Sequence, residues 1–367
     1  MKIICFSDIK WNFLKHRHHH VIQNLSKDHQ ILFIEPHSFN IFKSKTKVDK
    51  DFKNISVISI PKIPFIDNFI IFRKFNDLLI ILWSKHIVNK FGFKNSILLL
   101  YDPRYVCVVG KLNEKLVWYD IVDDRPSFKE VKTWINYYIN RLITNSNFIT
   151  TSSMILKEKI LQKRHNDIYF VGNGCDIDHF QHTNYQQTPS DIPKTKLIVG
   201  YFGTISDWFD FDLVEKILKT FPNLTVLLLG IVTPRVQKKI HSLTKYKNFF
   251  FLGEKKYDEL PFYLNAFKLT IIPFKINELT RAVNPLKLYE SCAARKPILS
   301  TDLPEINEID GAIWKATDHQ DFLNKLRIIL ETTCDSKKLI SIAEQNSWDK
   351  KIKELKLILS NYTKNNE

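Results

Sequence analysis

Short apolar runs alternate with longer amphipathic stretches along almost the whole chain. In the first half the apolar runs occupy residues 2–7, 30–35, 55–60, 96–101, 115–120, 147–151 and 168–171. Several are apolar at nearly every position, which is typical of parallel strands covered on both faces. The stretches between them predict helices over 14–27, 69–90, 130–144 and 153–163. This alternation predicts a doubly wound, Rossmann-like α/β domain.

The second half repeats the plan. Strands are predicted over 196–203, 224–230, 248–253, 268–274 and 296–301. The helices between them are expected near 209–220, 235–245, 257–266 and 285–294, and three closing helices over 318–332, 336–345 and 348–362. The polar, aperiodic stretch 181–195 reads as a linker.

We therefore predict an N-terminal domain over 1–180, a linker over 181–195, a second domain over 196–346 and a C-terminal helix over 347–367. That helix is long enough to return to the first domain, although nothing in the sequence requires it. In sheets of this kind ligands bind beyond the carboxyl ends of the strands. We expect the two domains to face each other across a cleft lined by those ends.

Composition narrows the class of protein. A chain of 367 residues with 44% hydrophobic residues suits two globular domains. Its five cysteines are scattered, so we expect free thiols in a reducing cytoplasm and no zinc site. The first apolar run is too short for a signal peptide. The most apolar segment, 63–83, carries four charges and does not predict a membrane span.

The net charge of +15 attracts phosphate-bearing partners in general. Residues 43–94 hold 11 Lys and Arg against 4 Asp and Glu, interleaved with apolar side chains. Two interpretations fit this segment equally well. It is either an interfacial surface that touches anionic lipid or a core helix with a solvated basic face.

The stretch RAVNPLKLYES, 281–291, has the polar residues of an anion site at a helix start. Asn284 precedes Pro285, which fits a first helical turn because it lacks an N–H. The free N–H groups of Leu286 and Lys287, with the helix dipole, favour an anion such as a pyrophosphate. The Lys287 side chain adds a full positive charge.

Two further charged residues belong to this stretch. Glu290 lies on the same helical face as Lys287, where a carboxylate can accept hydrogen bonds from the hydroxyls of a ribose. Arg281 supplies a second cation nearby. The alternative is an ordinary capped helix with a surface Lys–Glu pair.

A glycine follows the first apolar run of the second domain. Gly203 ends that strand, so the backbone there can approach a ligand closely, and Thr204 offers an N–H and a hydroxyl. A simple turn glycine is the alternative. The chain contains neither GxGxxG nor GxxxxGK[ST], which excludes the standard dinucleotide fingerprint and the P-loop.

Acidic residues crowd the end of the predicted strand 115–120. Neighbouring carboxylates raise one another's pKa, so Asp123 or Asp124 can serve as a general base. Solvated loop acids are the alternative.

The histidine-rich stretch KHRHHH, 15–20, lies at a helix start and points in several directions, so metal binding is disfavoured. We expect Arg17, with His16, to face an anion after the first strand.

Taken together, these motifs resemble glycosyltransferases of the GT-B fold, in particular family 4-like enzymes of bacterial teichuronic acid and exopolysaccharide synthesis. The resemblance spans nearly the whole chain. It rests on four segments in matching order: YDIVDDRPSF, VGNGCDIDHF, YFGTISDWFDFDLVEKI and RAVNPLKLYESCAARKPILSTDLPEI.

The resemblance implies roles for these residues. Gly203 and Thr204 would approach the donor phosphates, and Lys287 with the Leu286 amide would hold the pyrophosphate. Glu290 would hold the ribose, and the backbone near Gly253 would meet the base. Asp123 would be the catalytic base. Such enzymes usually need no metal or cofactor, because the helix dipole and basic residues stabilise the departing diphosphate.

The chain departs from the family pattern in two places. The family shows two glutamates at a fixed spacing, and Ala282 stands where the first is expected. The basic residues usual after the first donor-domain strand are absent from 204–209. Both retention and inversion of the sugar's configuration therefore stay open.

The sequence thus predicts a cytoplasmic glycosyltransferase, peripheral at the inner membrane face. It would move sugar from a UDP- or GDP-linked donor to a glycan or lipid-linked acceptor. A sugar-nucleotide epimerase on the same fold is the alternative. A nucleic-acid-binding protein is disfavoured, because arginine-rich tracts and RRM-like aromatic signatures are missing.

Overall fold

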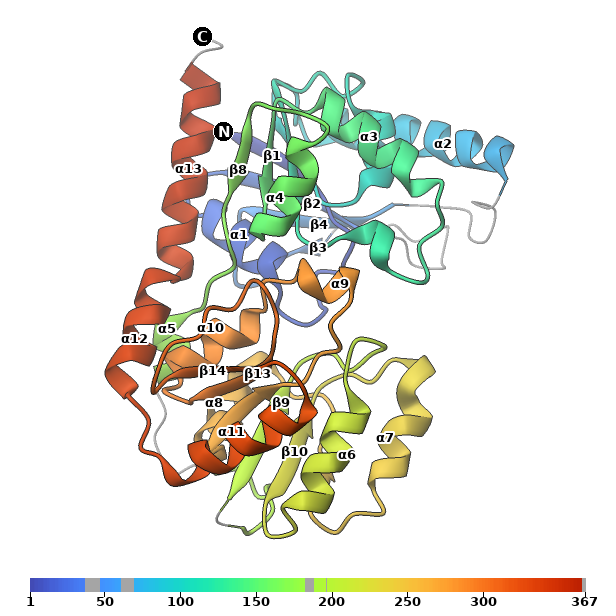
Figure 1. The fold of residues 1–367 in the computed structure, drawn as a ribbon. Helices are drawn as coiled ribbons and strands as arrows, with labels where there is room; N and C mark the ends of the chain where they lie inside the picture. Colours follow the sequence, from blue (N-terminus) through green and yellow to red (C-terminus); the bar gives the residue numbers. More distant parts are fainter. Residues whose placement is uncertain (37–46, 61–68, 182–187, 196, 365–367) are drawn as a thin grey trace. The chain divides into compact units, whose positions relative to one another are not determined.

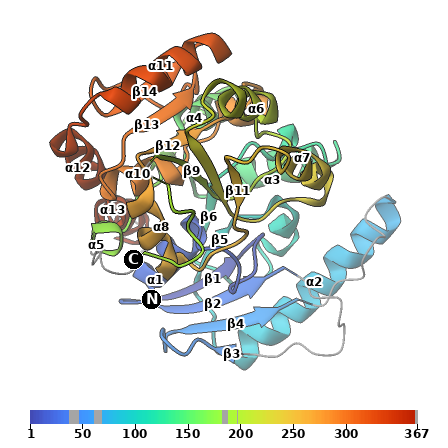
Figure 2. The ribbon, with the colours of Figure 1, turned by 90° about the horizontal axis from the view of Figure 1, so that it is seen from below.

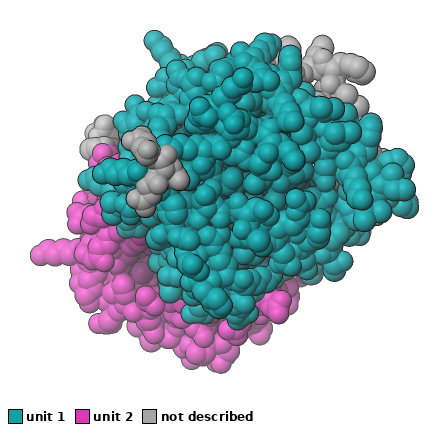
Figure 3. All heavy atoms as spheres, turned by 90° about the horizontal axis from the view of Figure 1, so that it is seen from above, with its two compact units in different colours: residues 1–171, 352–367 teal, residues 172–351 magenta. Residues whose placement is uncertain are grey.

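The computed structural model describes residues 1–36, 47–60, 69–181, 188–195 and 197–364. Parts of several predicted segments fall outside these residues. They are 43–46 and 61–68 of the basic segment 43–94, 63–68 of the most apolar segment, 182–187 of the linker, 196 of the strand 196–203 and 365–367 of the C-terminal helix. The chain divides into two compact units (Figure 3). Unit 1 comprises Met1–Val171 with Ile352–Glu367, and unit 2 comprises Gly172–Lys351.

Unit 1 is built on an eight-stranded sheet in the order β3-β4-β2-β1-β5-β6-β7-β8. All neighbouring strands are parallel except β3 and β4. The strands are β1 (Lys2–Phe6), β2 (Gln30–Glu35), β3 (Lys47–Val48), β4 (Ile55–Ser59), β5 (Ile97–Leu100), β6 (Leu116–Ile121), β7 (Phe148–Thr151) and β8 (Ile168–Phe170). The central strands β1, β5 and β6 are buried at nearly every position, as their apolar sequences predict.

Helices follow the strands of unit 1 along the chain (Figure 1). They are α1 (Arg17–Leu25), α2 (Ile70–Lys90), η1 (Pro103–Val108), η2 (Arg125–Ser127), α3 (Ile135–Asn145) and α4 (Met154–Leu161). The last helix, α13 (Trp348–Lys364), belongs to unit 1 from Ile352 onward. Its Tyr362 ring stacks on Phe148 with centroids 4.7 Å apart, and its hydroxyl lies 3.0 Å from that of Tyr169.

Unit 2 holds a six-stranded, fully parallel sheet in the order β11-β10-β9-β12-β13-β14. Its strands are β9 (Ile198–Phe202), β10 (Thr225–Leu229), β11 (Phe249–Phe251), β12 (Leu269–Ile272), β13 (Ile298–Thr301) and β14 (Ile313–Ala316). Its helices are α5 (Ile177–Gln181), α6 (Phe211–Thr220), α7 (Gln237–Leu243), α8 (Leu260–Ala266), α9 (Glu278–Arg281), α10 (Leu286–Ala293), α11 (His319–Glu331) and α12 (Ser336–Gln345), with the short turns η3 (Pro234–Val236) and η4 (Tyr257–Glu259).

Strand order in each sheet reverses at one point. In unit 1 the chain adds β2 on one side of β1 and then β5 on the other, and in unit 2 it adds β10 and later β12 on opposite sides of β9. Both sheets are therefore doubly wound, as predicted. Loops diverge at such a switch point and leave room for a ligand beyond the strand ends. The switch points lie between β1 and β5 and between β9 and β12 (Figure 2).

Sequence analysis missed the strands β3 and β14 and the short helices α5 and α9. Both strands lie at sheet edges. Edge strands are less covered than central ones, and β14 is partly exposed at its two middle positions and lacks the continuous apolar run of its neighbours. Within the residues that the structure describes, no helix combines the length and apolarity needed to cross a bilayer.

Candidate sites at the two switch points

Three adjacent strands of unit 2 end in glycines with positive φ. Gly203, Gly230 and Gly253 follow β9, β10 and β11 with φ of 123°, 135° and 69°. Their backbones are joined, because the amide of Gly203 donates to Leu229 O at 3.0 Å and that of Gly230 donates to Gly253 O at 2.7 Å. The carboxyl edge of this half-sheet is thus formed by bare backbone, which a ligand can approach closely.

Lys287 extends over this backbone. A Cβ added at Gly203 would lie 3.2 Å from Lys287 Cε and 3.5 Å from its Nζ. The ammonium also lies 5.4 Å from the ring centroid of Tyr201 and 5.0 Å from that of Phe274, within cation–π range of both. Phe274 follows β12, so the cation lies at the switch point between β9 and β12.

Burial lowers the pKa of Lys287 to about 8, and the nearby charge of Glu290 opposes that shift. Burial disfavours the charged form of a lysine. An anion beside Nζ would restore the charge that burial disfavours. The position of Lys287 and its lowered pKa therefore suit an anion-binding role.

The helix that carries Lys287 is fixed at its start by Asn284. The side chain of Asn284 accepts a hydrogen bond from the amide of Asn173 at 3.2 Å and donates one to the Tyr289 hydroxyl at 3.0 Å. Its carbonyl accepts from Asn173 Nδ2 at 2.6 Å. Asn284 is 5% exposed and positions α10 through these bonds, and its predicted part in donor binding stays a prediction.

The other residues predicted for this site lie around Lys287. Pro285 is the N-cap of α10, so Leu286 and Lys287 are in the first turn, where N–H groups lack intrahelical partners. Glu290 is buried, and its charge raises the pKa of Tyr257 after burial, which places the carboxylate near both Lys287 and Tyr257.

Thr204 and Arg281 complete the set of predicted donor-side residues. Thr204 O accepts a hydrogen bond from the Tyr201 hydroxyl at 2.7 Å, and the Thr204 side chain is partly exposed. Arg281 is exposed at the end of α9.

The switch point of unit 1 holds a small cavity of a different character. Its lining residues come from the ends of β1, β5 and β6 and the start of α1, and they are Asp8, His18, Tyr101, Tyr119, Ile121, Val122, Asp123 and Arg125. Burial and the charge of Asp8 raise the pKa of Asp123 to about 6, against the opposing effects of Arg125 and His18. A carboxylate with such a pKa is a suitable general base near neutral pH.

Asp8 is the fixed anion of this cavity. Its Oδ1 lies 2.8 Å from His18 Nε2, and its other oxygen pairs with Arg125. Burial would raise the pKa of Asp8, but Arg125 and His18 outweigh burial and lower it far below its usual range. Asp8 therefore stays ionised, and its negative charge raises the pKa of Asp123. The sequence analysis identified neither Asp8 nor His18 as part of a site.

The structure corrects the prediction for Arg17. Its side chain is 1% exposed, and its guanidinium donates to Asp120 at 2.9 and 3.1 Å and to the Val171 carbonyl at 2.8 Å. Asp120 also accepts from Thr150 at 2.7 Å. Arg17 therefore joins β6, β7 and the end of unit 1 and does not face a ligand. His18, one residue later, occupies the cavity instead.

Asp124 and His16 also differ from expectation. Asp124 accepts from Lys159 Nζ at 2.6 Å and Ser127 Oγ at 2.5 Å, so it holds the turn after β6. The amide of His16 donates to His19 Nδ1 at 3.0 Å, and its ring stacks on Phe13. Both residues thus stabilise local structure.

The histidine-rich stretch does not gather into a metal site. Burial lowers the pKa of His19 to about 4, and its Nε2 lies 2.9 Å from the Trp11 carbonyl. In the described part of the chain, no three His, Cys, Asp or Glu side chains are grouped so that they could hold a metal ion.

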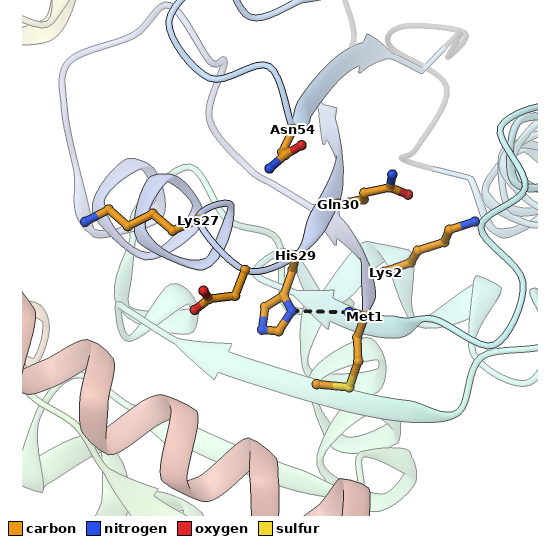
Figure 4. A pocket seen from close by; sticks show the side chains of 7 residues that line it. Met1, Lys2, Lys27, His29, Gln30 and Asn54 are labelled. Atoms are coloured by element: carbon orange, nitrogen blue, oxygen red, sulfur yellow. Dashed lines mark hydrogen bonds between the residues drawn. The ribbon is translucent and has the colours of Figure 1, made fainter.

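A third hollow lies at the opposite edge of the unit 1 sheet, where β1, β2 and β4 begin (Figure 4). Its polar side chains are bonded within the protein. Lys2 donates to Gly92 O at 2.6 Å, Lys27 to Asn24 at 2.8 Å, and Asp28 pairs with Lys356. Because it lies at the amino ends of the strands and its charges are already bonded, it is a weaker candidate than the switch points.

One family model matches part of the chain. The matched residues, 184–346, are similar to the family described as glycosyl transferases group 1. None of the curated protein sequences compared with the chain matches it.

Solved structures match both units together. A sucrose-phosphate synthase from Thermosynechococcus elongatus has a TM-score of 0.78 at 11% identity, covering 98% of each chain. HepE from Anabaena, solved with UDP and glucose, has a TM-score of 0.70 at 16% identity, covering 98% of this chain and all of its own. A glycosyltransferase from Rickettsia africae has a TM-score of 0.71 at 12% identity, covering 99% of each chain. These matches confirm the predicted fold class, which is GT-B with two Rossmann-like units.

Proposed function

We propose that this protein is a glycosyltransferase that moves a sugar from a nucleoside diphosphate donor to a hydroxyl of a glycan or lipid-linked acceptor in cell-surface polysaccharide synthesis. The observation that carries the proposal is the position of Lys287. Its ammonium lies over the backbone of Gly203, at the switch point of the unit that is similar to group 1 glycosyl transferases. Backbone access and a partly buried positive charge suit a diphosphate.

Unit 2 would bind the donor. The diphosphate would lie between Gly203 and the first turn of α10, in contact with Lys287 and the amides of Leu286 and Lys287. Glu290 would accept hydrogen bonds from the ribose hydroxyls, and the backbone near Gly253 would meet the base. UDP is the first candidate nucleotide, because HepE and a trehalose-6-phosphate protein of E. coli were solved with UDP or a UDP-sugar. GDP remains the second.

Unit 1 would supply the base. In the reaction the acceptor oxygen forms a bond to the anomeric carbon as the bond from that carbon to the diphosphate breaks. The acceptor proton would pass to Asp123, whose pKa of about 6 leaves it mostly ionised at neutral pH. The electron pair of the broken bond leaves with the diphosphate, and Lys287 and the α10 dipole would stabilise that charge without a metal.

A nucleotide screen tests the proposal first. UDP-, GDP- and dTDP-sugars are added separately to the full-length protein, and a ligand that binds the folded state raises Tm by mass action. We expect a rise with one nucleotide class, which the Lys287→Met variant fails to show. If no sugar nucleotide or nucleoside diphosphate raises Tm or binds in calorimetry, the proposal is wrong.

Product analysis then separates transfer from epimerisation. The donor identified by the screen is incubated with the enzyme, first alone and then with candidate glycan acceptors. A transferase releases nucleoside diphosphate and yields more of it with an acceptor. An epimerase instead converts the sugar of the donor without any acceptor. Proton NMR of the transferred sugar reports whether its configuration is retained or inverted.

A further inference from the structure

Helix α2 buries a mixed face against unit 1, made of Asn76, Ile80, Ser84, Ile87 and Val88, and leaves a row of apolar side chains exposed. Asn76 and Ser84 are 3% and 0% exposed, whereas Ile71, Phe75, Leu78 and Leu82 are 75%, 47%, 50% and 56% exposed. These four apolar residues recur every three or four positions and so form one stripe along the outer face. A helix that served only unit 1 would be expected to expose few apolar side chains, so this stripe needs another explanation.

Specific contacts fix the helix in this orientation. Asp77 accepts a hydrogen bond from the Tyr138 hydroxyl of α3 at 3.1 Å. One turn earlier, the Arg73 guanidinium lies over the Trp134 ring at 4.9 Å. Rolling α2 about its axis to bury the stripe would break both contacts and turn the buried residues Ile80 and Ile87 outward. The outward apolar face is therefore built into the packing of α2 on α3.

The charges of the outer face are of one sign. The exposed lysines of α2 are at positions 74, 85 and 90. The single acid of the helix, Asp77, lies on the inner side with Tyr138. Lys74 and Lys85 flank the apolar stripe at helical spacing. An apolar stripe edged by lysines matches the surface of an anionic bilayer, with acyl chains beneath acidic headgroups.

We propose that the outer face of α2 is a docking surface for an anionic lipid membrane. A second copy of the chain fits less well, because pairing this face with itself brings lysines against lysines. Phe69, Ile70 and Phe72 are also 66%, 61% and 45% exposed at the start of the helix, which extends beyond the sheet of unit 1 in Figures 1 and 2. The helix would lie on the membrane and would not cross it, since its inner face stays on unit 1.

For the part of residues 43–94 that the structure describes, this inference favours the interfacial, lipid-facing interpretation over a core helix with a solvated basic face. It does not depend on the proposed glycosyl transfer, since the docking face and the switch-point sites use different residues. A lipid-linked acceptor would, however, be presented at such a surface.

Vesicle flotation with the full-length protein tests the proposal. The vesicles contain phosphatidylcholine alone or phosphatidylcholine with about one third phosphatidylglycerol. We expect binding to the anionic vesicles only, weakened by salt because the lysine contribution is screened. The Ile71→Ser/Phe75→Ser/Leu78→Ser variant should reduce the bound fraction at least tenfold. The Lys74→Glu/Lys85→Glu variant should do so as well.

Matched controls change exposed residues elsewhere. Ile328→Ser/Leu357→Ser removes two apolar side chains that are 57% and 64% exposed. Lys238→Glu/Lys337→Glu makes the same charge change at two exposed lysines of α7 and α12. Both controls should bind anionic vesicles like the wild type. All variants alter exposed side chains and should keep the wild-type Tm.

Three outcomes would overturn the proposal. The wild type could fail to bind anionic vesicles, or the α2 variants could bind as well as the controls. The third outcome is self-association in sedimentation velocity that the α2 variants abolish while vesicle binding is absent, which would assign the face to a second copy.

Discussion

The two switch points of this chain share one topology but have opposite chemistry. In unit 2 the strands β9, β10 and β11 are followed by glycines, and the ammonium of Lys287 lies over Gly203. In unit 1 the corresponding strand ends carry the carboxylates Asp8 and Asp123, with Arg125 and His18 between them. The same sheet geometry can therefore present an anion site or a proton acceptor, depending on which side chains follow the strands.

Burial shifts the pKa values of the two sites in opposite directions. It lowers the pKa of Lys287 to about 8 and raises that of Asp123 to about 6. In each case burial disfavours the charged form. Between these two values Lys287 is mostly protonated and Asp123 mostly ionised, which is the pair of states that diphosphate binding and base catalysis require.

The largest expected effect is on the proton acceptor. Asp123→Asn should lower turnover about 10²- to 10⁴-fold, the range for a lost general base, and leave donor affinity unchanged. Turnover is measured as nucleoside diphosphate released in the presence of acceptor. The free energy of unfolding should not fall at pH 8. Because the pKa of Asp123 is higher in the folded than in the unfolded protein, its ionised carboxylate destabilises the fold at this pH. The amide of the Asn variant carries no charge and removes that destabilisation.

The neighbouring acid serves as the control. Asp124→Asn breaks an ion pair with the partly exposed Lys159 and should lower turnover less than about tenfold, because such pairs contribute little. If Asp124→Asn is as inactive as Asp123→Asn, or if Asp123→Asn keeps full turnover, Asp123 is not the base.

The second-largest effect concerns the glycines at the strand ends of unit 2, and it tests whether the fold there requires residues without a side chain. A Cβ at Gly230 would lie 2.0 Å from the Gly203 carbonyl oxygen. Gly230→Ala should therefore destabilise the protein by about 3 kcal/mol or more, because backbone must move. Gly253 also has positive φ but open space around its Cβ position. Gly253→Ala should cost only about 1–2 kcal/mol of conformational strain. Urea unfolding of both variants checks the order, and equal losses would contradict it.

The cation is tested by Lys287→Met, which removes the charge and keeps most of the stem. Affinity for the nucleoside diphosphate should fall roughly 10- to 100-fold, the range for a hydrogen bond to a charged group. Lys296→Met is the matched control. Burial also lowers the pKa of Lys296 to about 8, but its ammonium donates to the Asn265 carbonyl. Calorimetry should show little change in affinity for that variant, and equal losses in both would refute a specific role for Lys287.

The smallest effect is a pH profile whose two limbs come from different units. kcat/KM should fall up to tenfold per pH unit below about 6, as Asp123 is protonated, and again above about 8, as Lys287 loses its proton. Lys287→Met should abolish the alkaline limb and leave the acid limb in place. A wild-type profile that is flat from pH 5 to 9 would contradict both assignments.

Much of this could be predicted from the sequence. The central strands were found because they are apolar at every position, and Gly203 and Lys287 were selected because they follow such strands. Gly230 ends an equally clear run and was missed only because the family motifs do not include it. The edge strands β3 and β14 lack the signal on which the prediction depended.

What the sequence could not show is which side chain already has a partner. Arg17, Asp124 and Asn284 were predicted to contact ligands, yet each is bonded to a residue distant in sequence or to its own turn. His18 was overlooked beside Arg17 because neighbouring positions at a helix start point in different directions. The exposed apolar stripe of α2 was also hidden, because apolar residues occur on both its buried and its exposed side.

The most direct test of the account is a crystal structure with bound UDP or GDP, whichever the screen selects. The account predicts the diphosphate beside Gly203, with its oxygens within hydrogen-bond distance of Lys287 Nζ and of the Leu286 and Lys287 amides. A nucleotide bound elsewhere, with Lys287 still lying on the Tyr201 and Phe274 rings and no phosphate near Gly203, would contradict it.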